Sequence, residues 1–320
     1  MPKLMQDHPA WHATATGAAR VMRCGGVPWL LTWTTDALDV EATPLRGLTF
    51  EPPVIDRISP ISPTAAPLSA LAAAFSELGT VLRVRNADLW DAIGTAIIRQ
   101  VIRAGQARLM YRRFCEAHGE SMPTPHGTAY LFPDPATVLG LPARAFTDLG
   151  MTFKHRALAA AAQAALDHGE KWTTLPPAEL INQVQAVPRI GPWTAGAAIA
   201  DWSGDFALYP YADLAVRTWA ARAAPEVAWP ADEPAFQTLW RHHAAQHLSS
   251  LTLLTLALPL QGRARTQGRV DVAVALSGAA GGLGSGFVVA ASGFTALSLA
   301  GGAASLVVLA AVLRPVRSVS

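Results

Sequence analysis

The sequence predicts a mainly α-helical protein with a small β-containing piece at its N-terminus and an apolar helical hairpin at its C-terminus. In the middle of the chain, apolar residues recur at helical spacing between short turns that contain proline and glycine. Residues 11–50 instead mix β-favouring runs with turn residues, and residues 272–313 carry no charged side chain. We therefore expect three parts, at residues 1–65, 66–265 and 270–320.

The N-terminal part is expected to hold a small antiparallel sheet followed by a linker. The run VPWLLTWT at 27–34 is rich in β-favouring side chains, and Gly25 and Gly26 directly before it suit a tight turn. The run EPPVIDRISPISPTAAP at 51–67 contains five prolines. Because proline lacks a backbone N–H and disrupts helices, we predict a linker there.

The middle part is predicted to be built from helices alone. Amphipathic spacing, capping residues and C-terminal glycines place helices at 89–104, 108–119, 134–140, 142–149, 153–168, 176–187, 192–203 and 212–224. Short turns join these segments, and no strand pattern interrupts them. An all-α core is the architecture that such a series favours.

The C-terminal part has the composition of a membrane protein. Its uncharged stretch is long enough for two spans of about 20 residues each, at 272–291 and 293–313. Arginines lie on both sides of it, which by the positive-inside rule places both ends in the cytoplasm. The tail resembles the last helix pair of a major-facilitator transporter, although two spans alone cannot form a transport path. A fused or frameshifted segment explains it better than a working membrane anchor.

Net charge and cysteine content restrict the possible functions. The chain is formally +2, and residues 272–320 contribute two arginines and no acidic side chain, so residues 1–271 are neutral overall. Nucleic-acid binding would therefore depend on local geometry, such as helix N-termini and backbone N–H groups. Cys24 and Cys115 are too few for a four-cysteine iron–sulfur cluster. A cytoplasmic protein with reduced cysteines is expected, since the N-terminus also has no apolar secretory segment.

The most informative stretch is residues 176–220, which begins with a hairpin. Pro188 and Pro192 bound a turn between two amphipathic helices that is short enough only for a tight hairpin, with Gly191 at the start of the second helix. That helix start would point outward, and its free N–H groups and positive dipole end suit one DNA phosphate. An ordinary αα-hairpin in a helical bundle explains the hairpin alone equally well.

Asp213 follows the second helix after a loop and begins another helix. A lone aspartate at such a place is more often a helix cap than a functional group. The combination carries more information: a hairpin, a Trp-Thr-Ala helix start, an aromatic-Pro loop, the aspartate, and an apolar helix with Arg217. This order resembles the signature of the helix-hairpin-helix DNA glycosylase superfamily, whose motif ends in a catalytic aspartate.

The resemblance covers roughly residues 66–260 and is closest to the 3-methyladenine DNA glycosylase II branch. Residues 86–119 resemble the first core helices, with Gln100 at a position that is commonly glutamine, and residues 132–163 resemble the next helical block. It implies a two-lobed helical bundle with a helix-hairpin-helix motif. The N-terminal piece would then be a trimmed form of the α/β domain that precedes the core in that branch.

The resemblance also implies a reaction. The enzyme would flip an alkylated purine out of damaged double-stranded DNA and hydrolyse its N-glycosidic bond, as in base excision repair. Asp213 would stabilise the positive charge that develops on the deoxyribose and orient the attacking water. Trp193 occupies the position of a nucleophilic lysine in lyase-type members, so the enzyme should be monofunctional, without strand cleavage through a Schiff base.

Three residues are expected to bind the flipped base. Trp193 would offer an aromatic face to a cationic purine, and Tyr209 and Gln100 would complete the pocket. The alternative for Trp193 is an indole that packs the hairpin against the bundle. Met122, after the helix that ends near Gly119, aligns with the apolar wedge that fills the gap left in the duplex. Its alternative is an ordinary methionine of an exposed loop.

The hairpin is expected to contact DNA and to hold a monovalent cation. The resemblance assigns DNA contacts to Arg189, Gly191 and Thr194, and assigns a structural Na⁺ or K⁺ to the backbone carbonyls of Gln185, Val187 and Ile190. Relatives usually carry glycine where this chain has Arg189. If that position needs a positive φ, the arginine carries strain of about 1 kcal/mol. No further cofactor is expected.

Two other readings stay open from the sequence. A non-catalytic DNA-binding module on the same scaffold is favoured by Arg189 and by residues 248–258, which are aliphatic and hydroxylic where relatives carry an aromatic pocket residue. A membrane-tethered protein at the inner face of the cytoplasmic membrane is favoured by the tail alone. The main expectation is a cytoplasmic monomer that acts on damaged DNA.

Overall fold

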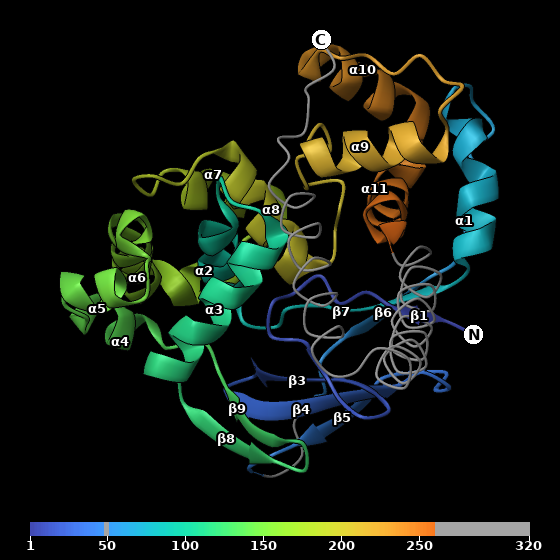
Figure 1. Cartoon of the computed structure of the whole chain (residues 1–320). Helices are drawn as coiled ribbons and strands as arrows, with labels where there is room; N and C mark the ends of the chain where they lie inside the picture. Colours follow the sequence, from blue (N-terminus) through green and yellow to red (C-terminus); the bar gives the residue numbers. More distant parts are fainter. Residues whose placement is uncertain (48–50, 260–320) are drawn as a thin grey trace, which may run out of the picture. The chain divides into compact units, whose positions relative to one another are not determined.

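The computed structural model describes residues 1–47 and 51–259, and Figure 1 shows its course. The tail at 270–320, with its predicted membrane hairpin, lies outside the described residues. Within the described ranges, no helix combines the length and the apolar character that a membrane span requires. The described residues belong to one compact unit, and about half of them are helical.

The first sheet has four antiparallel strands in the order β2(His12–Ala13), β3(Gly17–Cys24), β4(Val27–Thr34) and β5(Glu41–Pro44). Gly25 and Gly26 join β3 to β4 with φ values of 58° and 77°. Two consecutive positive φ angles define the tight hairpin turn whose twist matches that of paired strands, and glycine adopts them at little cost. The predicted antiparallel piece and its turn are confirmed.

The second sheet corrects the predicted linker. Its strands run in the order β1(Lys3–Leu4), β7(Val81–Val84) and β6(Ile55–Ile58), and β6 lies inside the proline-rich run. The prolines of that run flank residues 54–59, so the N–H groups of β6 remain free to pair with β7. All four residues of β7 are buried.

A third, two-stranded sheet stands where only helices were expected. It pairs β8(Ser121–Thr124) with β9(Gly127–Tyr130), so the prediction of an all-α middle is wrong. Gly127 has a φ of 103° in the turn, and the Thr124 hydroxyl accepts a hydrogen bond from the His126 N–H at 3.1 Å. Local turn chemistry therefore favours the hairpin, whose inner face packs on the first sheet.

The described residues contain eleven α-helices, of which the first and the last two were not predicted and the other eight match the predicted segments between residues 89 and 224. They are α1(Ala72–Leu78), α2(Leu89–Arg99), α3(Ala104–His118), α4(Pro135–Gly140), α5(Ala143–Asp148), α6(Thr152–Thr174), α7(Pro177–Gln185), α8(Pro192–Ser203), α9(Leu214–Ala223), α10(Glu233–Ala244) and α11(Leu248–Ala257). Two short 3₁₀ helices lie at Leu68–Leu71 and Ala245–His247. Helix α2 ends earlier than expected, and α6 continues past Gly169 because Trp172 on its last turns is buried.

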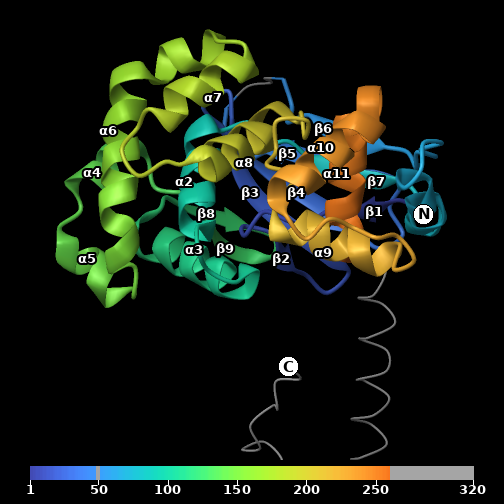
Figure 2. The ribbon, with the colours of Figure 1, turned by 90° about the horizontal axis from the view of Figure 1, so that it is seen from above.

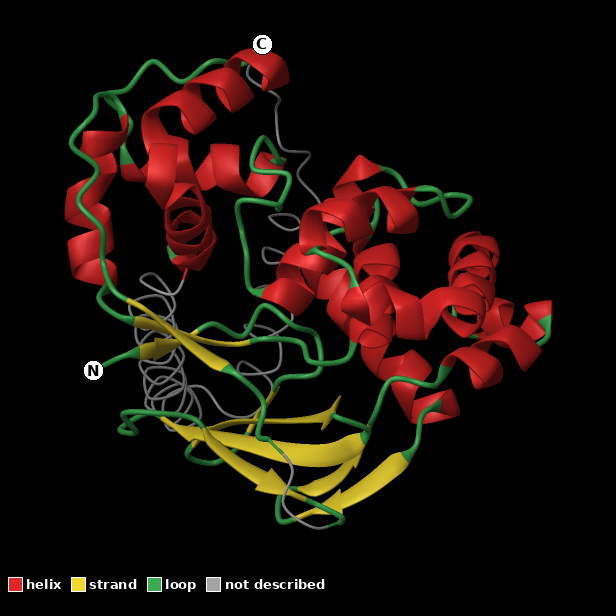
Figure 3. Cartoon of the chain, turned by 180° about the vertical axis from the view of Figure 1, so that it is seen from behind, coloured by secondary structure: helices red, strands yellow, loops and turns green. Residues whose placement is uncertain are grey.

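The helices form two groups above the strands (Figures 1 and 3). One group is built around α2, which contacts α3, α6 and α8; the other contains α1, α9, α10 and α11, with α9 and α1 both against α11. Seen from above, the two groups lie side by side (Figure 2). A shared set of buried apolar side chains runs through both groups.

A buried polar network ties the N-terminal segment to α2. The Asp91 carboxylate accepts a hydrogen bond from the Tyr111 hydroxyl at 2.8 Å and from the Asn86 amide at 3.2 Å. Its oxygens also lie 3.3 Å from His8 Nε2 and 3.6 Å from Arg20 Nη2. Burial raises the pKa of Asp91, but the charges of His8 and Arg20 outweigh it and hold this pKa well below its ordinary value.

Candidate active site

The predicted hairpin is present between α7 and α8. Val187 and Ile190 are buried and anchor the turn, whereas Arg189 is exposed. Arg189 has a φ of 72°, so the positive φ on which the expected strain depends is present. Gly191 has an extended φ of −88° and precedes the first residue of α8. The arginine thus adopts the left-handed conformation itself, and its side chain remains exposed.

The side chain of Gln100 is hydrogen-bonded to the hairpin turn and to the start of α8. One amide N–H bond of its side chain points to the carbonyl oxygen of Arg189 at 3.3 Å and the other to the Thr194 hydroxyl at 2.7 Å. Both donors are therefore occupied, and Gln100 does not line the cleft described below. Thr194 itself is buried. What the hairpin offers to a phosphate is the set of backbone N–H groups at the start of α8.

The loop before Asp213 lies directly on α8. A Cβ atom at Gly196 would stand 2.8 Å from the carbonyl oxygen of Leu208 and 3.2 Å from the Pro210 ring. Only glycine permits this approach, because real Cβ atoms essentially never come so close to a backbone oxygen. The packing of this loop fixes where α9 starts, and with it the place of Asp213.

Asp213 occupies the N-cap position of α9, but its side chain makes no capping hydrogen bond. The simple explanation of this aspartate as a cap is therefore wrong. The Tyr209 hydroxyl instead donates to Asp213 Oδ2 at 3.0 Å. Tyr209 is buried, and its burial and the Asp213 charge both raise the pKa of this phenol far above its ordinary value. It stays a proton donor that orients the carboxylate.

Asp213 and Trp193 open into the same cleft, which has a volume of about 670 Å³. The other charged groups that line it are Arg99 and Arg103, and its apolar lining includes Val101, Leu214 and Trp219. Leu214 is 70% exposed and Val101 is completely exposed. The cleft thus brings together a carboxylate, an indole, two guanidinium groups and exposed aliphatic side chains.

Met122 lies in the interior of the protein, whereas a wedge residue has to lie at the surface. It is 1% exposed and packs in strand β8 against Ala19, Val21 and Leu30 of the first sheet. Alternation of side chains along the strand turns this methionine inward, so the expectation of an apolar wedge at Met122 is wrong. Tyr209 is likewise buried and is absent from the lining of the cleft.

Val101 is a residue of the cleft that the sequence analysis missed. It follows Gln100 in the turn between α2 and α3 and has a φ of 59°, a conformation that β-branched side chains almost never adopt. The buried Lys154 supports this turn, because its ammonium group donates to the carbonyl oxygens of Ile97 at 2.8 Å and Gln100 at 2.7 Å. The signal in the sequence was an aliphatic residue directly after Gln100.

The carbonyl groups of the predicted cation site lie at the end of α7 and in the hairpin turn. The Val187 carbonyl accepts the Ile190 N–H at 3.1 Å, which leaves one of its two lone pairs for another partner. Gln185 ends α7 and is exposed. The Na⁺ or K⁺ site stays a prediction, with these backbone carbonyl oxygens as the ligands of the cation.

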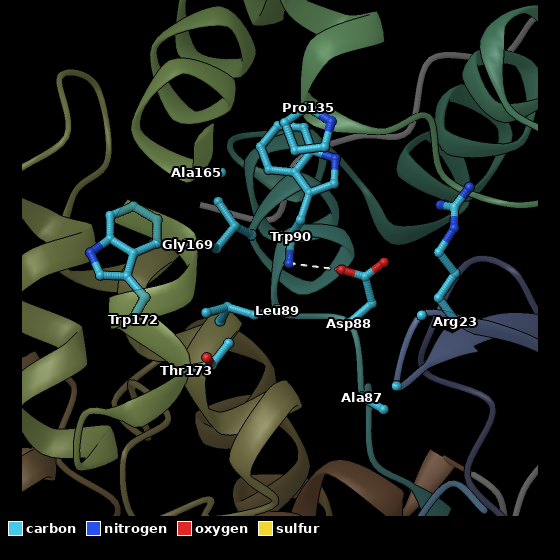
Figure 4. A pocket seen from close by; sticks show the side chains of 13 residues that line it. Arg23, Ala87, Asp88, Leu89, Trp90, Pro135, Ala165, Gly169, Trp172 and Thr173 are labelled. Carbon is cyan, nitrogen blue, oxygen red and sulfur yellow. Dashed lines mark hydrogen bonds between the residues drawn. The ribbon is translucent and has the colours of Figure 1, made fainter. Parts of the chain in front are cut away.

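A second cavity, of about 370 Å³, lies at the opposite end of α2 (Figure 4). Asp88, Trp90 and Trp172 line it together with the hairpin glycines of the first sheet. The Asp88 carboxylate caps α2 by accepting from the N–H groups of Trp90 and Asp91. Burial, followed by the nearby Asp91 charge, raises the pKa of Asp88 to about 6. Its carboxylate is committed to the helix cap.

Comparisons with known proteins give different results for the C-terminal tail and for the rest of the chain. No protein-family model matches the chain. Among curated sequences, the tail has only partial matches to two uncharacterized MFS-type transporters of Bacillus subtilis (strain 168), with 48% identity over 66 residues and 43% identity over 86 residues. The chain spans 15% and 20% of the length of these two relatives.

Solved structures resemble most of the chain. The DNA-bound 8-oxoguanine glycosylase/lyase of Clostridium acetobutylicum superposes with a TM-score of 0.59 at 14% identity, covering 82% of this chain and 90% of that one. The 3-methyladenine DNA-glycosylase of Archaeoglobus fulgidus gives a TM-score of 0.59 at 15% identity, with 80% and 90% covered. The chain therefore has the fold seen in DNA glycosylases.

Proposed function

We propose that this protein is a monofunctional DNA glycosylase that removes a damaged purine from double-stranded DNA. The observation that carries the proposal is the Asp213 carboxylate. It stands at a helix start without capping it, is oriented by Tyr209, and opens into a cleft beside Trp193. An oriented carboxylate in a cleft large enough for a purine fits a reaction that builds positive charge on a sugar.

The chemistry follows from this arrangement. As the glycosidic bond breaks, positive charge develops on the deoxyribose, and a preorganised negative charge stabilises it most where water is excluded. Asp213 supplies that charge and orients the water that attacks C1′. The Tyr209 hydroxyl holds one carboxylate oxygen at 3.0 Å, which keeps the other oxygen directed toward the cleft.

The absence of a cleft lysine supports a monofunctional enzyme. The chain has three lysines, at Lys3, Lys154 and Lys171. None lines the cleft, where Trp193 stands instead, and Lys154 is buried against the end of α2. A Schiff base with the sugar needs a nucleophilic amine at the reacting carbon. The product should therefore be an intact strand with an abasic site.

DNA binding is assigned to the hairpin and to the rim of the cleft. The N–H groups at the start of α8 would hold one phosphate, with Arg189 beside them and a monovalent cation on the hairpin carbonyls. Val101 replaces Met122 as the side chain that fills the gap in the duplex, because it is apolar, fully exposed and at the rim. The protein would act as a monomer.

Excision of alkylated purines is the substrate range that the sequence resemblance implies. The indole of Trp193 is half-buried and lines the cleft, where it can contact a purine that enters. Stacking on an indole is favourable for purines of any charge state. Trp193 therefore supports a purine substrate without choosing among purines.

Base release from defined duplexes tests the proposal. Each duplex carries one modified purine, either methylated or deaminated, and abasic sites are detected by alkaline cleavage. Wild type should generate abasic sites, whereas Asp213→Asn, which keeps the size of the side chain and the Tyr209 contact, should bind the same duplex and release about 10²–10³-fold less base. Asp148→Asn is the matched control, because Asp148 is exposed on α5 and is not among the residues that line the cleft.

Two outcomes would contradict the proposal. A protein that binds the duplexes but yields no abasic site from any of them is a DNA-binding module. Equal release by wild type and Asp213→Asn would exclude this carboxylate from the reaction.

A further inference from the structure

The cleft beside Asp213 has an excess of positive charge. Three charged side chains line it, one carboxylate from Asp213 and two guanidinium groups from Arg99 and Arg103. Within the described part of the chain, neither guanidinium makes an ion pair or a side-chain hydrogen bond. Arginine stays protonated at any physiological pH. A base that enters the cleft therefore meets a permanent positive charge in addition to the aspartate.

Arg99 lines the cleft together with Asp213. It is half-buried in the last turn of α2. Burial raises the pKa of Tyr209, and the positive charge of Arg99 acts against that rise. Burial also raises the pKa of Asp7, but the charges of Arg83 and Arg99 outweigh it and lower this pKa. The guanidinium of Arg99 is therefore within electrostatic range of the phenol that orients the catalytic carboxylate.

We infer that this cleft selects damaged purines that are uncharged and carry hydrogen-bond acceptors, and rejects purines alkylated at N3 or N7, which bear a fixed positive charge. The inference rests on the proposed function. Two like charges in a partly buried cleft repel each other, so a cationic base is disfavoured beside Arg99. An uncharged purine with free O6 and N7 atoms instead presents the edge that the arginine fork pairs with.

Trp193 does not oppose this selection. An uncharged base stacks on the indole, since every base has a π face. The additional cation–π attraction that a methylated purine would gain at Trp193 is offset by two guanidinium groups in the same cleft. Arg103 is exposed at the start of α3 and Arg99 is half-buried, so Arg99 should have the larger effect on the base.

Excision of hypoxanthine and of 7-methylguanine from one duplex sequence tests the inference. Hypoxanthine is uncharged with free O6 and N7 atoms, whereas 7-methylguanine is cationic and has no free N7. Single-turnover rates of the full-length protein are divided by the spontaneous loss of each base, because a cationic base leaves DNA more easily by itself. Wild type should accelerate the loss of hypoxanthine more than that of 7-methylguanine.

Substitutions of the two cleft arginines test whether their charge causes the selection between the two bases. Arg99→Met removes the charge and keeps the length of the side chain, and it should shift the ratio of the two accelerations toward 7-methylguanine by about tenfold. Arg103→Met, at an exposed position, should shift it in the same direction by less, and carries the test if Arg99→Met does not fold. Arg144→Met, on the exposed face of α5, should leave the ratio unchanged.

The possible results distinguish a failure of charge selection from a failure of the proposed glycosylase function. If 7-methylguanine receives the larger acceleration and neither arginine variant changes the ratio, charge selection is wrong and the glycosylase function stands. Arginines that only bind phosphate would lower both rates together and leave the ratio constant, which also contradicts the inference. If wild type releases neither base from any duplex, the proposed function fails, and the inference with it.

Discussion

The proposed role of Asp213 follows from the absence of a capping hydrogen bond from its side chain. An aspartate at a helix start ordinarily caps the first turn, yet Asp213 leaves that turn uncapped and accepts a hydrogen bond from Tyr209. The sequence predicted this residue and Trp193 as neighbours in one cleft, and the geometry agrees. It did not predict that Gln100 is committed to the hairpin, because residue type alone does not show which partner an amide finds.

Gly196 should control the position of Asp213. Gly196→Ala places a Cβ atom 2.8 Å from the Leu208 carbonyl oxygen, so the loop before Asp213 must shift, at a cost of about 1–3 kcal/mol in the free energy of unfolding. Base release should fall together with stability. Gly169→Ala in α6 is the control, since its Cβ meets nothing within 4 Å, and thermal unfolding should show it slightly stabilised. An unshifted melting temperature for Gly196→Ala would contradict the close packing.

Val101 should affect base flipping without supporting the fold. Val101→Ala relieves part of the strain at its φ of 59°, so the melting temperature should stay constant or rise. Excision from a fully paired duplex should fall by about tenfold, since flipping costs a few kcal/mol that an inserted side chain helps to offset. Excision from a duplex with an abasic site opposite the damaged base should fall less. Equal losses on both substrates would argue against insertion.

Among the helices and strands, local sequence patterns predicted the helices between residues 89 and 224 but did not predict strands that pair over long distances in the sequence. The hairpin between α7 and α8 and the start of α9 were predictable because their signals lie within a few residues. Strands β6 and β8 were missed because each is defined by a partner: β6 pairs with β7, and Met122 in β8 packs on the first sheet. A proline-rich run hides a strand when its prolines lie outside the paired residues.

The hairpin carries strain that a single substitution should release. Arg189 has a φ of 72°, and glycine adopts this region without a steric cost. Arg189→Gly should therefore raise the free energy of unfolding by about 1 kcal/mol, measured by denaturant titration. If the exposed guanidinium binds a phosphate, affinity for undamaged duplex DNA should fall in the same variant, and the salt dependence of binding should weaken. A lower stability would show that the turn does not strain the arginine.

At the scale of the whole molecule, the N-terminal segment is part of the framework that holds α2. Strands β1 and β6 both pair with β7, and His8 and Arg20 reach the Asp91 carboxylate of α2. Helix α2 then carries Arg99 and Gln100 to the cleft and the hairpin. The sequence predicted the N-terminal piece but not this connection, because the partners of Asp91 are distant along the chain.

The buried network around Asp91 should make the stability of the fold depend on pH in the acidic range. The pKa of Asp91 is lower in the folded protein than its ordinary value, so its contribution is fully present above about pH 4 and is lost as the pH falls further. Asp91→Asn should lower the free energy of unfolding at pH 7 by about 3–5 kcal/mol. Its melting temperature should also change less than that of wild type between pH 5 and 3. A variant with the wild-type acid profile would contradict the role of this carboxylate.

The role of Asp213 is tested by single-turnover release of a damaged purine by wild type and by Asp213→Asn on the same duplex, with DNA affinity measured in parallel. Wild type should leave an abasic site in an uncleaved strand, whereas the variant should lose nearly all release and retain its affinity for the duplex. Release that persists without the carboxylate, or that never occurs although the duplex is bound, would contradict it.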